Sequence, residues 1–310
     1  MPLIIRKPEP IWTIKEFTEN HNTILLTRKT GGFGDIMMHR MLFEDIKILC
    51  PEIKIHFAVP SNFMPVVIDH PYIDQVLDWT KVEPKNYLKH LDTTTICGET
   101  EMINAPFPSP HRSDIWANWC GYELKNHNMH INFTEEEIKY ARDTLNHIKN
   151  RDKVVIFCPY SAIKSKNLDE EQIRGVVEGL EKEYFVCGLH TVDIPGLETT
   201  ITTRTMREYM ALIAVADYII TVDTAAFHVA GGIGKPQVGI FSWASGTVYG
   251  KYYKNWQLIQ RDRDFTPGWD CGPCYRWSTC PKCPDHNQVR KPCITEITAE
   301  EILSAFDKIC

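Results

Sequence analysis

The sequence predicts an α/β protein made of two Rossmann-like halves. From Thr23 onward, short apolar runs of strand length alternate with longer segments of helical periodicity, which is typical of repeated βα units and a mostly parallel sheet. The chain has 310 residues, a length that suggests about two domains of ordinary size. A polar, charged segment at Lys149–Lys153 separates the two series of elements, so we expect domains at residues 1–150 and 151–310.

The first half reads as a βαβαβ run followed by further helices. Pro51 stops the first helix, Ser61 is a candidate N-cap, and Thr134 with Glu137 forms a capping box. The pattern weakens between residues 80 and 110. The expected strands are Thr23–Arg28, Ile53–Val59, Gln75–Leu77 and Thr94–Cys97, and the expected helices are Asp35–Cys50, Ser61–Asp69, Ser113–Cys120 and Glu135–Lys149.

The second half repeats the alternation. Thr298 and Glu301 form another capping box, which opens a last helix that runs to Lys308. The expected strands are Val154–Cys158, Phe185–Cys187, Tyr218–Val222 and Gln237–Phe241, and the expected helices are Asp169–Glu183, Thr205–Ala216 and Thr224–Gly232.

The overall composition excludes several classes of protein. The chain carries 34 Lys and Arg against 40 Asp and Glu, a net charge of −6, which argues against a uniformly basic protein that coats nucleic acid. With 43% hydrophobic and 24% charged residues, disorder and a fibre are excluded. The N-terminus lacks a cationic segment followed by an apolar one, and charges interrupt the most apolar stretch, Leu212–Val238. We therefore expect no signal peptide, no membrane span and a cytoplasmic location.

The most informative stretch is Val222–His228, where a predicted strand passes into a predicted helix. Open α/β sheets bind ligands at such a junction, and the free N–H groups of a helix N-terminus attract phosphate. Asp223 and Thr224 offer short polar contacts there, and the small Ala225 leaves room for a diphosphate. In the alternative interpretation, Asp223 is only an N-cap and His228 is a histidine of the core.

A glycine-rich turn, Gly31–Gly34, precedes Asp35. Its spacing fits neither a dinucleotide-binding fingerprint nor a P-loop, which removes the main support for a dehydrogenase or a kinase. Asp35 could be the N-cap of the next helix. It could also be a general base, because glycines that let a substrate approach beside one carboxylate suit a reaction at an acceptor hydroxyl.

These motifs, in their order along the chain, resemble those of the heptosyltransferase-like glycosyltransferases of family 9. The run Ile219–Gly246 looks like the family's donor-site signature, an Asp-Thr/Ser-Gly-x-x-His helix start followed by a Gly-Lys-Pro turn and a strand. Gly31–Ile36 resembles its Gly-Asp turn, and Pro71–Asp74 a landmark at the third strand. The resemblance implies a GT-B fold, in which two Rossmann-like domains face a cleft and the C-terminal one holds most of the nucleotide-sugar.

The resemblance also implies a role for each half. In the N-terminal, acceptor-binding half, Asp35 matches the catalytic base, and we place Arg28, Gly32 and Gly34 on the acceptor side of the cleft.

In the C-terminal, donor-binding half, Asp223, Thr224 and His228 match residues that contact the nucleotide diphosphate. Lys166 matches a phosphate-contacting lysine, although the aromatic residue and the proline that usually follow it are absent. Ala225 replaces the usual glycine. These departures concern the identity of the donor more than the class of reaction.

Eleven cysteines are present, and five of them lie within residues 271–293. Cys271 with Cys274, and Cys280 with Cys283, have the C-x2-C spacing that closes two thiolates on one tetrahedral zinc. We expect a structural zinc on these four, with Cys293 or His286 as alternate ligands and an Fe–S cluster as the alternative. Some heptosyltransferase-like proteins resemble this chain in having such a segment before the last helix. The remaining cysteines are expected to be small buried hydrophobes: Cys50, Cys97, Cys120, Cys158, Cys187 and Cys310.

Two further patterns concern metals and partners. Asp262-Arg263-Asp264 is a D-x-D triplet, which holds a divalent cation in GT-A glycosyltransferases, but so short a pattern arises easily and its arginines suggest an exposed turn. Residues 251–293 carry eight Lys or Arg against four Asp, together with many aromatic residues. This mixture suits an anionic partner such as a phosphorylated glycan or DNA. Aromatics that pack a metal-bound loop are the alternative.

We therefore expect an inverting glycosyltransferase without a catalytic divalent metal. By family resemblance, its donor is an ADP-activated heptose or a similar sugar, and its acceptor a glycan of the lipopolysaccharide type at the inner face of a membrane. Two alternatives stay open: transfer to a hydroxylated base in DNA, and a non-catalytic nucleotide- or nucleic-acid-binding protein with a zinc knuckle.

Overall fold

The computed structural model describes residues 22–269, 271–275 and 292–310. It divides into two compact units: the first holds the chain up to Thr100 and Pro110–Asn132, and the second holds Glu101–Ser109 and Phe133–Cys310. The division therefore falls between Asn132 and Phe133 and not at the predicted Lys149–Lys153 segment. The physical reason is that the helix before that segment packs against a helix of the second unit.

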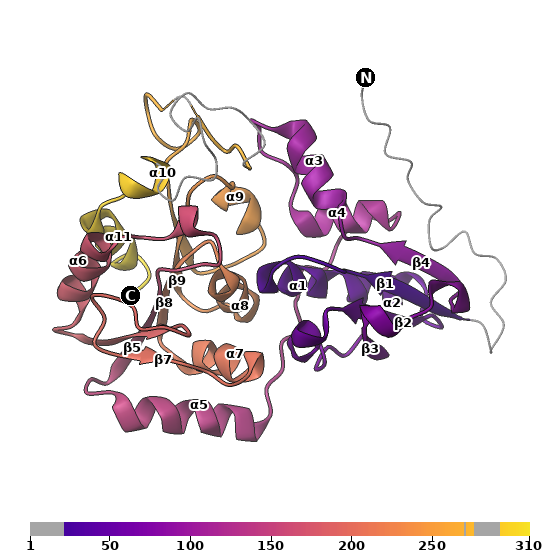
Figure 1. Cartoon of the computed structure of the whole chain (residues 1–310), viewed down its shortest axis with the longest axis horizontal. Helices are drawn as coiled ribbons and strands as arrows, with labels where there is room; N and C mark the ends of the chain where they lie inside the picture. The colour runs from indigo at the N-terminus through magenta and orange to yellow at the C-terminus, as the bar shows by residue number, and fades with distance from the viewer. Residues whose placement is uncertain (1–21, 270, 276–291) are drawn as a thin grey trace. The chain divides into compact units, whose positions relative to one another are not determined.

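The first unit is built on a four-stranded parallel sheet with the strand order β3-β2-β1-β4 (Figure 1). β1 pairs with β2 on one side and β4 on the other, and its Ile24, Leu25 and Leu26 are fully buried. The strand order reverses between β1 and β4, and open α/β sheets bind ligands at such a switch point. The strands are β1 Thr23–Thr27, β2 Lys54–Val59, β3 Gln75–Asp78 and β4 Lys89–Asp92.

The helices of this unit differ from the prediction in three places. The predicted helix Asp35–Cys50 begins two residues earlier, at Phe33, and a 3₁₀ turn interrupts it. Ser61 is the first residue of a 3₁₀ helix and not its cap. The strand predicted at Thr94–Cys97 is wrong, because Asp92 Oδ1 accepts the Thr94 N–H at 3.0 Å and turns the chain into a helix. The helices are α1 Phe33–His39, α2 Phe43–Leu49, α4 Arg112–Trp119 and α3 Ile96–Asn104, of which the residues from Glu101 onward belong to the second unit. 3₁₀ turns lie at Arg40–Leu42, Ser61–Val66, Trp79–Lys81 and Pro84–Asn86.

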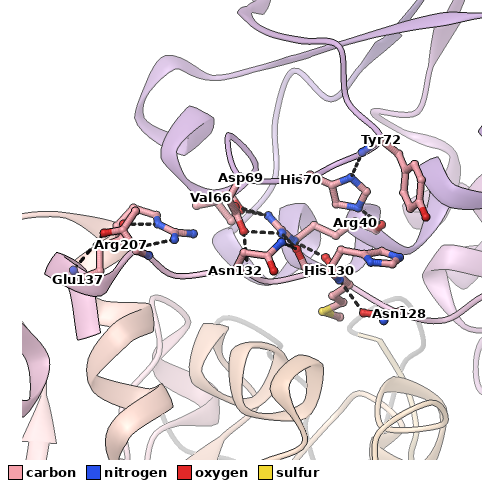
Figure 2. A network of polar contacts seen from close by, with 12 residues as sticks. Arg40, Val66, Asp69, His70, Tyr72, Asn128, His130, Asn132, Glu137 and Arg207 are labelled. Atoms are coloured by element: carbon pink, nitrogen blue, oxygen red, sulfur yellow. Dashed lines mark hydrogen bonds and ion pairs between the residues drawn. The ribbon is translucent and has the colours of Figure 1, made fainter. Parts of the chain in front are cut away.

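A buried arginine holds the last segment of the first unit in place (Figure 2). Arg40 Nε donates to the Met129 carbonyl at 2.7 Å, and its two terminal nitrogens donate to the Asp69 carboxylate at 2.9 Å each. The carbonyls of Val66 and His130, both at 2.6 Å, take the two remaining N–H groups. A fully buried guanidinium is stable only when its charge and N–H groups are paired in this way. The network therefore connects residues 129–130 to the end of the 3₁₀ helix at Ser61–Val66.

The second unit contains a six-stranded sheet, again parallel, with the order β10-β9-β8-β5-β6-β7. Its switch point lies between β5 and β8. β7 and β10 were absent from the prediction, β7 because it has two residues and β10 because its polar residues Gln257 and Gln260 interrupt the apolar run. The strands are β5 Lys153–Cys158, β6 Tyr184–Leu189, β7 Thr200–Ile201, β8 Tyr218–Val222, β9 Gln237–Phe241 and β10 Trp256–Gln260.

Both predicted capping boxes are confirmed in the second unit. Thr134 Oγ1 accepts the Glu137 N–H at 3.2 Å, and Thr298 Oγ1 accepts the Glu301 N–H at 3.3 Å. Each glutamate bonds back to the N–H of its threonine at 2.9 Å. The helices are α5 Glu135–Ile148, α6 Glu170–Leu180, α7 Met206–Val215, α8 Ala225–Ile233, α9 Gly246–Tyr249, α10 Pro292–Thr295 and α11 Ala299–Phe306, with a 3₁₀ turn at Lys164–Lys166.

Four of the scattered cysteines, Cys97, Cys120, Cys158 and Cys187, are buried as expected, whereas Cys50 is half-buried and Cys310 exposed. No helix in the described part of the chain combines the length and the apolar character needed to cross a bilayer.

A close contact on α8 makes one glycine indispensable. A Cβ added at Gly231 would lie 2.3 Å from the ring of Tyr253, which is itself buried. We expect Gly231→Ala to lower the free energy of unfolding by about 1–3 kcal/mol, measured by urea denaturation. The same change at Gly32, where nothing lies within 4 Å of the added Cβ, is the control. Equal stability of the two variants would show that the Tyr253 ring moves to make room for the added methyl group.

Candidate functional site

Asp35 is held at the switch point of the first sheet. The chain leaves β1 through Arg28 and turns at Gly31, whose φ of +121° lies in a region that favours glycine. A side chain at Gly31 would also collide with Arg28 and Asp35, each 2.8 Å from the added Cβ. Asp35 occupies the first turn of α1, and its Oδ2 accepts the Gly32 N–H at 3.0 Å. It therefore stabilises the helix start but is not the N-cap, which is Gly32.

Two arginines flank the Asp35 carboxylate. Arg112, at the start of α4, donates to Oδ1, and a terminal nitrogen of Arg28 lies 3.4 Å from Oδ2. Burial alone would raise the pKa of Asp35, but the charges of Arg112 and Arg28 and the Gly32 N–H outweigh it and hold the pKa well below its usual range. Asp35 is therefore ionised at neutral pH. Arg28 is anchored to the Thr93 carbonyl at 2.9 Å, and its buried Nε has no hydrogen-bond partner among the described residues.

A neutral histidine is hydrogen-bonded to the backbone carbonyl of Asp35. His39 is fully buried, with Nδ1 2.8 Å from the Asp35 carbonyl oxygen and Nε2 2.9 Å from the Thr93 hydroxyl. Burial, reinforced by the charge of Arg28, lowers the pKa of His39 to about 3. A carbonyl can only accept, so the single ring proton of the neutral form lies on Nδ1. The indole of Trp116 lies 3.5 Å from the imidazole, centroid to centroid.

This burial makes stability depend on pH in a predictable direction. His39 and His70 have pKa values lowered by burial from 6.5 to about 3, so between these values the unfolded chain binds protons that the folded protein does not. Stability is complete above pH 6.5 and declines as the pH falls, by about 2 kcal/mol for each histidine at pH 5. Urea denaturation at pH 7 and pH 5 measures the loss. His39→Gln should remove about half of it, and the same change at the exposed His147 should remove none. A pH dependence unaltered in His39→Gln would contradict this assignment.

Lys166 occupies the corresponding position in the second unit. Its Nζ lies 2.6 Å from Asp223 Oδ2, donates to the Asp223 carbonyl at 3.3 Å, and lies 4.5 Å from the centroid of the Trp243 ring. Lys166, Asp223 and Trp243 follow β5, β8 and β9, so three neighbouring strand ends converge on one ammonium group. Asp223 is thus an ion-pair partner and not the N-cap of α8, which is Thr224.

At the start of α8, the N-cap residue Thr224 makes no side-chain capping hydrogen bond to the described residues. The N-terminus of this helix could therefore bind a ligand. Nearby, the Ser242 hydroxyl is 3% exposed and has no hydrogen-bond partner in the described part of the chain. His228 lies one turn into α8, buried among aromatic rings, with Nδ1 2.8 Å from the Tyr253 hydroxyl. This placement favours the interpretation as a core histidine, and its contact with a diphosphate stays a prediction.

A comparison with protein families gives one match, which begins at α4 and extends past β10. The model of glycosyltransferase family 9 (heptosyltransferase) matches residues 112–267, about half of the chain. The chain belongs to glycosyltransferase family 9. The resemblance inferred from the motifs is thereby confirmed, and so is the assignment of this protein as a glycosyltransferase. A comparison with curated protein sequences finds no match.

Solved structures show the fold of this family 9 member. ADP-heptose lipopolysaccharide heptosyltransferase II of E. coli superposes with a TM-score of 0.67 at 13% identity, covering 93% of this chain and 98% of the other. A family 9 glycosyltransferase of Veillonella parvula gives 0.69 at 16% identity, covering 94% and 98%. The iron-containing dodecameric glycosyltransferase TibC of enterotoxigenic E. coli gives 0.67 at 15% identity, covering 94% and 79%. The predicted α/β class with parallel sheets is confirmed.

The cysteine segment of the family 9 chain is described only in part. Cys280, Cys283 and His286 lie outside the described residues. Cys271 Sγ accepts the Trp269 indole N–H at 3.0 Å, and the backbone N–H groups of Cys274 and Tyr275 both donate to the Trp243 carbonyl. Within residues 22–269, 271–275 and 292–310, no three His, Cys, Asp or Glu side chains form a group that could hold a metal.

The D-x-D triplet is a structural turn in this family 9 chain. Arg263 and Asp264 are exposed, as expected for a charged turn. Asp262 is buried, and its Oδ1 accepts the N–H groups of Asp264 at 2.9 Å and Phe265 at 3.0 Å. Burial raises its pKa.

Sequence reasoning missed three residues of these two sites. Arg112 and Trp243 are distant in sequence from the residues they contact, and no local pattern marks them. His39 stands one helical turn after Asp35, a spacing that places both on one face of a helix and could have suggested their contact.

Proposed function

We propose that this glycosyltransferase moves a sugar from a nucleoside-diphosphate sugar to a hydroxyl group of a glycan, with inversion at the anomeric carbon. The observation that carries the proposal is the pair of buried charged sites at the switch points of the two sheets. One offers an ionised carboxylate, Asp35, and the other an ammonium group, Lys166, beside the N-terminus of α8. A base for the acceptor and a cation for the diphosphate are the groups that such a transfer needs.

The donor would bind at Lys166. In the structure its charge is shared with Asp223, so an incoming diphosphate would replace part of that ion pair. The first N–H groups of α8 would add a favourable dipole, and the Ser242 hydroxyl is a further candidate contact because it is buried without a partner among the described residues. Thr224 and Ala225 lie at the same helix start. Since one of the similar structures is an ADP-heptose lipopolysaccharide heptosyltransferase, we propose an ADP-activated sugar.

Asp35 would act on the acceptor. As the acceptor oxygen forms its bond to the anomeric carbon, the bond from that carbon to the phosphate oxygen breaks and its electron pair leaves with the nucleoside diphosphate. The hydroxyl proton passes to an Asp35 oxygen. Because Arg28 and Arg112 hold the pKa of Asp35 low, the carboxylate is a weak base. Its proton transfer would therefore come late, when the attacking hydroxyl has become strongly acidic. Gly32 and Gly34 would let the acceptor approach.

A ligand screen on the full chain tests the donor assignment. ADP, UDP, GDP and CDP are compared by thermal shift, because a ligand that binds only the folded protein raises its stability by about 2.7 kcal/mol at a hundredfold excess over Kd. We expect ADP to give the largest shift, and ADP-heptose to be consumed when a glycan acceptor is added. A protein that binds no nucleoside diphosphate would contradict the proposal.

For the acceptor we propose a glycan of the lipopolysaccharide type, which would bring the enzyme to the inner face of a membrane. None of the relatives reported above is described as acting on DNA. Salt tests this choice, because each phosphate contact to a DNA duplex contributes a slope of about −0.9 in log affinity against log salt. Acceptor KM with only a shallow salt dependence supports a small glycan, and a steep one would contradict it.

The cysteine segment is a candidate metal site outside both charged sites. Cys271 and Cys274 lie in a turn that two backbone hydrogen bonds anchor to Trp243, which suits one half of a four-thiolate site. A bound metal would brace this loop and supply no step of the reaction. We propose that Cys271, Cys274, Cys280 and Cys283 are the ligands, with Cys293 or His286 as alternates.

We expect about one metal ion per chain in protein purified without added metal. Elemental analysis distinguishes zinc, expected from the spacing, from iron, which the related TibC contains. Replacing Cys271 and Cys274 by serine should remove the metal, and Cys310→Ser, at an exposed cysteine, should not. Full-length protein free of both metals would contradict the assignment.

A further inference from the structure

The second unit carries a concentrated apolar surface that the proposed chemistry does not use. At the end of α3 and in the loop that follows, residues 102–109 contain no charged side chain. Met102, Ile103 and Phe107 are 46%, 52% and 62% exposed. Phe265 is 45% exposed, and no other phenylalanine in the described part of the chain is exposed to the extent of these two. Scattered apolar residues are ordinary on a protein surface, whereas a group of bulky ones marks an interaction site.

One arginine joins the two segments of this surface. The guanidinium carbon of Arg263 lies 5.8 Å from the centroid of the Phe107 ring, and Arg263 Nε donates to the Gly272 carbonyl at 2.9 Å. Phe265 follows Arg263 by two residues, in the turn that the Asp262 carboxylate closes. The turn therefore brings Phe265 near Phe107. These side chains form the apolar patch: Met102, Ile103, Phe107 and Phe265.

Hydrogen bonds hold both ends of the α3 segment on the second unit. The Tyr249 hydroxyl donates to Glu101 Oε1 at 3.1 Å, and the Ser109 N–H donates to the Tyr275 hydroxyl at 3.3 Å. All four residues are buried. The exposed side chains between them therefore project from a fixed support, which reduces the conformational entropy that the patch would lose on binding a partner.

The size of the patch favours a lipid surface over a second copy of the chain. A stable protein interface buries about 800 Å² on each partner, whereas a large aromatic side chain offers about 150–250 Å² when fully exposed. Four large side chains that are about half exposed supply roughly 400 Å², half of what a stable dimer needs. A bilayer sets no such minimum, because membrane binding grows with whatever apolar area enters the acyl boundary.

The charges beside the patch suit an anionic lipid surface. In the segment that ends in the patch, residues 251–265, three cations are exposed, Lys251, Lys254 and Arg263. Asp264 is the one exposed anion of that segment. Lys and Arg side chains at a membrane surface are attracted by anionic headgroups. The excess of positive charge therefore complements a bilayer that contains anionic lipid.

The covalent chain also keeps the patch near the charged site of Asp35. Arg112, which donates to Asp35 Oδ1, follows Phe107 by five residues. Because an extended chain spans at most about 3.6 Å per residue, the Cα atoms of Phe107 and Arg112 lie within about 18 Å of each other. A glycan that extends from a lipid surface at the patch would be within a few sugar rings of the carboxylate.

We propose that the apolar patch docks this enzyme on an anionic lipid bilayer, with Phe107 and Phe265 in the acyl boundary and Arg263 at the level of the headgroup phosphates. The inference rests on the proposed function, since a glycan of the lipopolysaccharide type is held in a membrane by its lipid. Docking would bring the Asp35 carboxylate to the surface that carries its acceptor.

Co-sedimentation of the full-length protein with vesicles tests the proposal. Vesicles of equal parts phosphatidylcholine and phosphatidylglycerol are compared with vesicles of phosphatidylcholine alone. We expect a partition coefficient on the order of 10⁴ M⁻¹ for the anionic vesicles, similar to that of a single inserted acyl chain, and weaker binding to the neutral ones. Protein that stays in the supernatant with both kinds of vesicle would overturn the proposal.

Matched variants assign the binding to the patch. Phe107→Ser and Phe265→Ser should each weaken vesicle binding about 10-fold, because burial of a large apolar side chain contributes on this order. Val192→Ser and Ile68→Ser are the controls, at residues 59% and 68% exposed outside the patch, and should change nothing. Arg263→Gln should weaken binding to the anionic vesicles about fivefold and leave binding to the neutral vesicles unchanged. Equal losses in the patch variants and the controls would overturn the assignment.

Analytical ultracentrifugation without lipid distinguishes a bilayer from a second copy of the chain. We expect Phe107→Ser to leave the oligomeric state of the protein unchanged. If Phe107→Ser instead dissociates an oligomer, and the wild-type protein does not bind vesicles, the patch is a contact between copies and the proposal is wrong.

Calorimetric titration with ADP keeps the docking surface and the proposed function apart. Normal ADP binding by a protein that ignores both kinds of vesicle would remove the docking surface and leave the proposed function intact. Vesicle binding that depends on Phe107 and Phe265, in a protein that binds no nucleoside diphosphate, would retain the docking surface and remove the proposed function.

Discussion

Asp35→Asn should reduce the rate of sugar transfer by a factor of about 10² to 10⁴, the usual contribution of a positioned general base. The amide keeps the shape of the carboxylate but cannot take a proton from the acceptor hydroxyl. Because Asp35 lies in the first unit and the proposed donor site in the second, nucleoside diphosphate affinity should stay near its normal value. Steady-state transfer assays and calorimetric titration with ADP measure the two effects.

The same substitution removes a counter-charge, so its effect on folding needs a control. Arg28 and Arg112 both pair with Asp35, and the loss of that pairing should lower stability. Asp74→Asn is the matched change, because Asp74 pairs with Lys47 at 2.7 Å and accepts the Ile55 N–H at 2.7 Å elsewhere in the first unit. It should leave the transfer rate unchanged. A folded Asp35→Asn variant with near-normal turnover would reduce Asp35 to a residue that stabilises the start of α1.

Lys166→Ala should weaken the binding of the nucleoside diphosphate by about 10- to 100-fold, since a hydrogen bond to a charged group contributes about 1.5–3 kcal/mol. Transfer should slow as well, because the same ammonium would stabilise the leaving diphosphate as its charge develops. Calorimetry gives the affinity, and single-turnover assays with saturating donor give the rate of the chemical step.

Lys164→Ala is the control for this experiment. Lys164 belongs to the same 3₁₀ turn but is exposed, so its loss should change neither quantity. Lys166→Arg keeps the charge while changing the geometry at the Trp243 ring, and should recover part of the affinity. If Lys166→Ala binds ADP normally, the donor does not lie at the end of β5 and β8, and the role carried over from the family is wrong.

Local sequence patterns were sufficient for most elements of both sheets. Strands such as Ile219–Val222 are buried on both faces, which makes them continuous apolar runs, and the boxes at Thr134 and Thr298 mark two helix starts within four residues each. Local patterns did not predict the boundary between the two units, which lies between Asn132 and Phe133. Residues 149–153 are charged because they join α5 to β5 at the surface, whereas α5 belongs to the second unit because it packs against α7.

The sequence by itself determined the family of this protein, and with it the identity of Asp35, Lys166 and Asp223 as candidates, because each stands in a motif whose spacing is local. Only the tertiary structure decided which side chains act on them. Arg112 reaches Asp35 across 77 positions of sequence and Lys166 reaches Asp223 across 57. Such pairs form where parallel strands bring distant loops to one edge of a sheet, and no periodicity along the chain records that order. The burial of Asp35 and its low pKa depend on these neighbours. The chemistry of the site is therefore set by the tertiary structure and not by the local sequence.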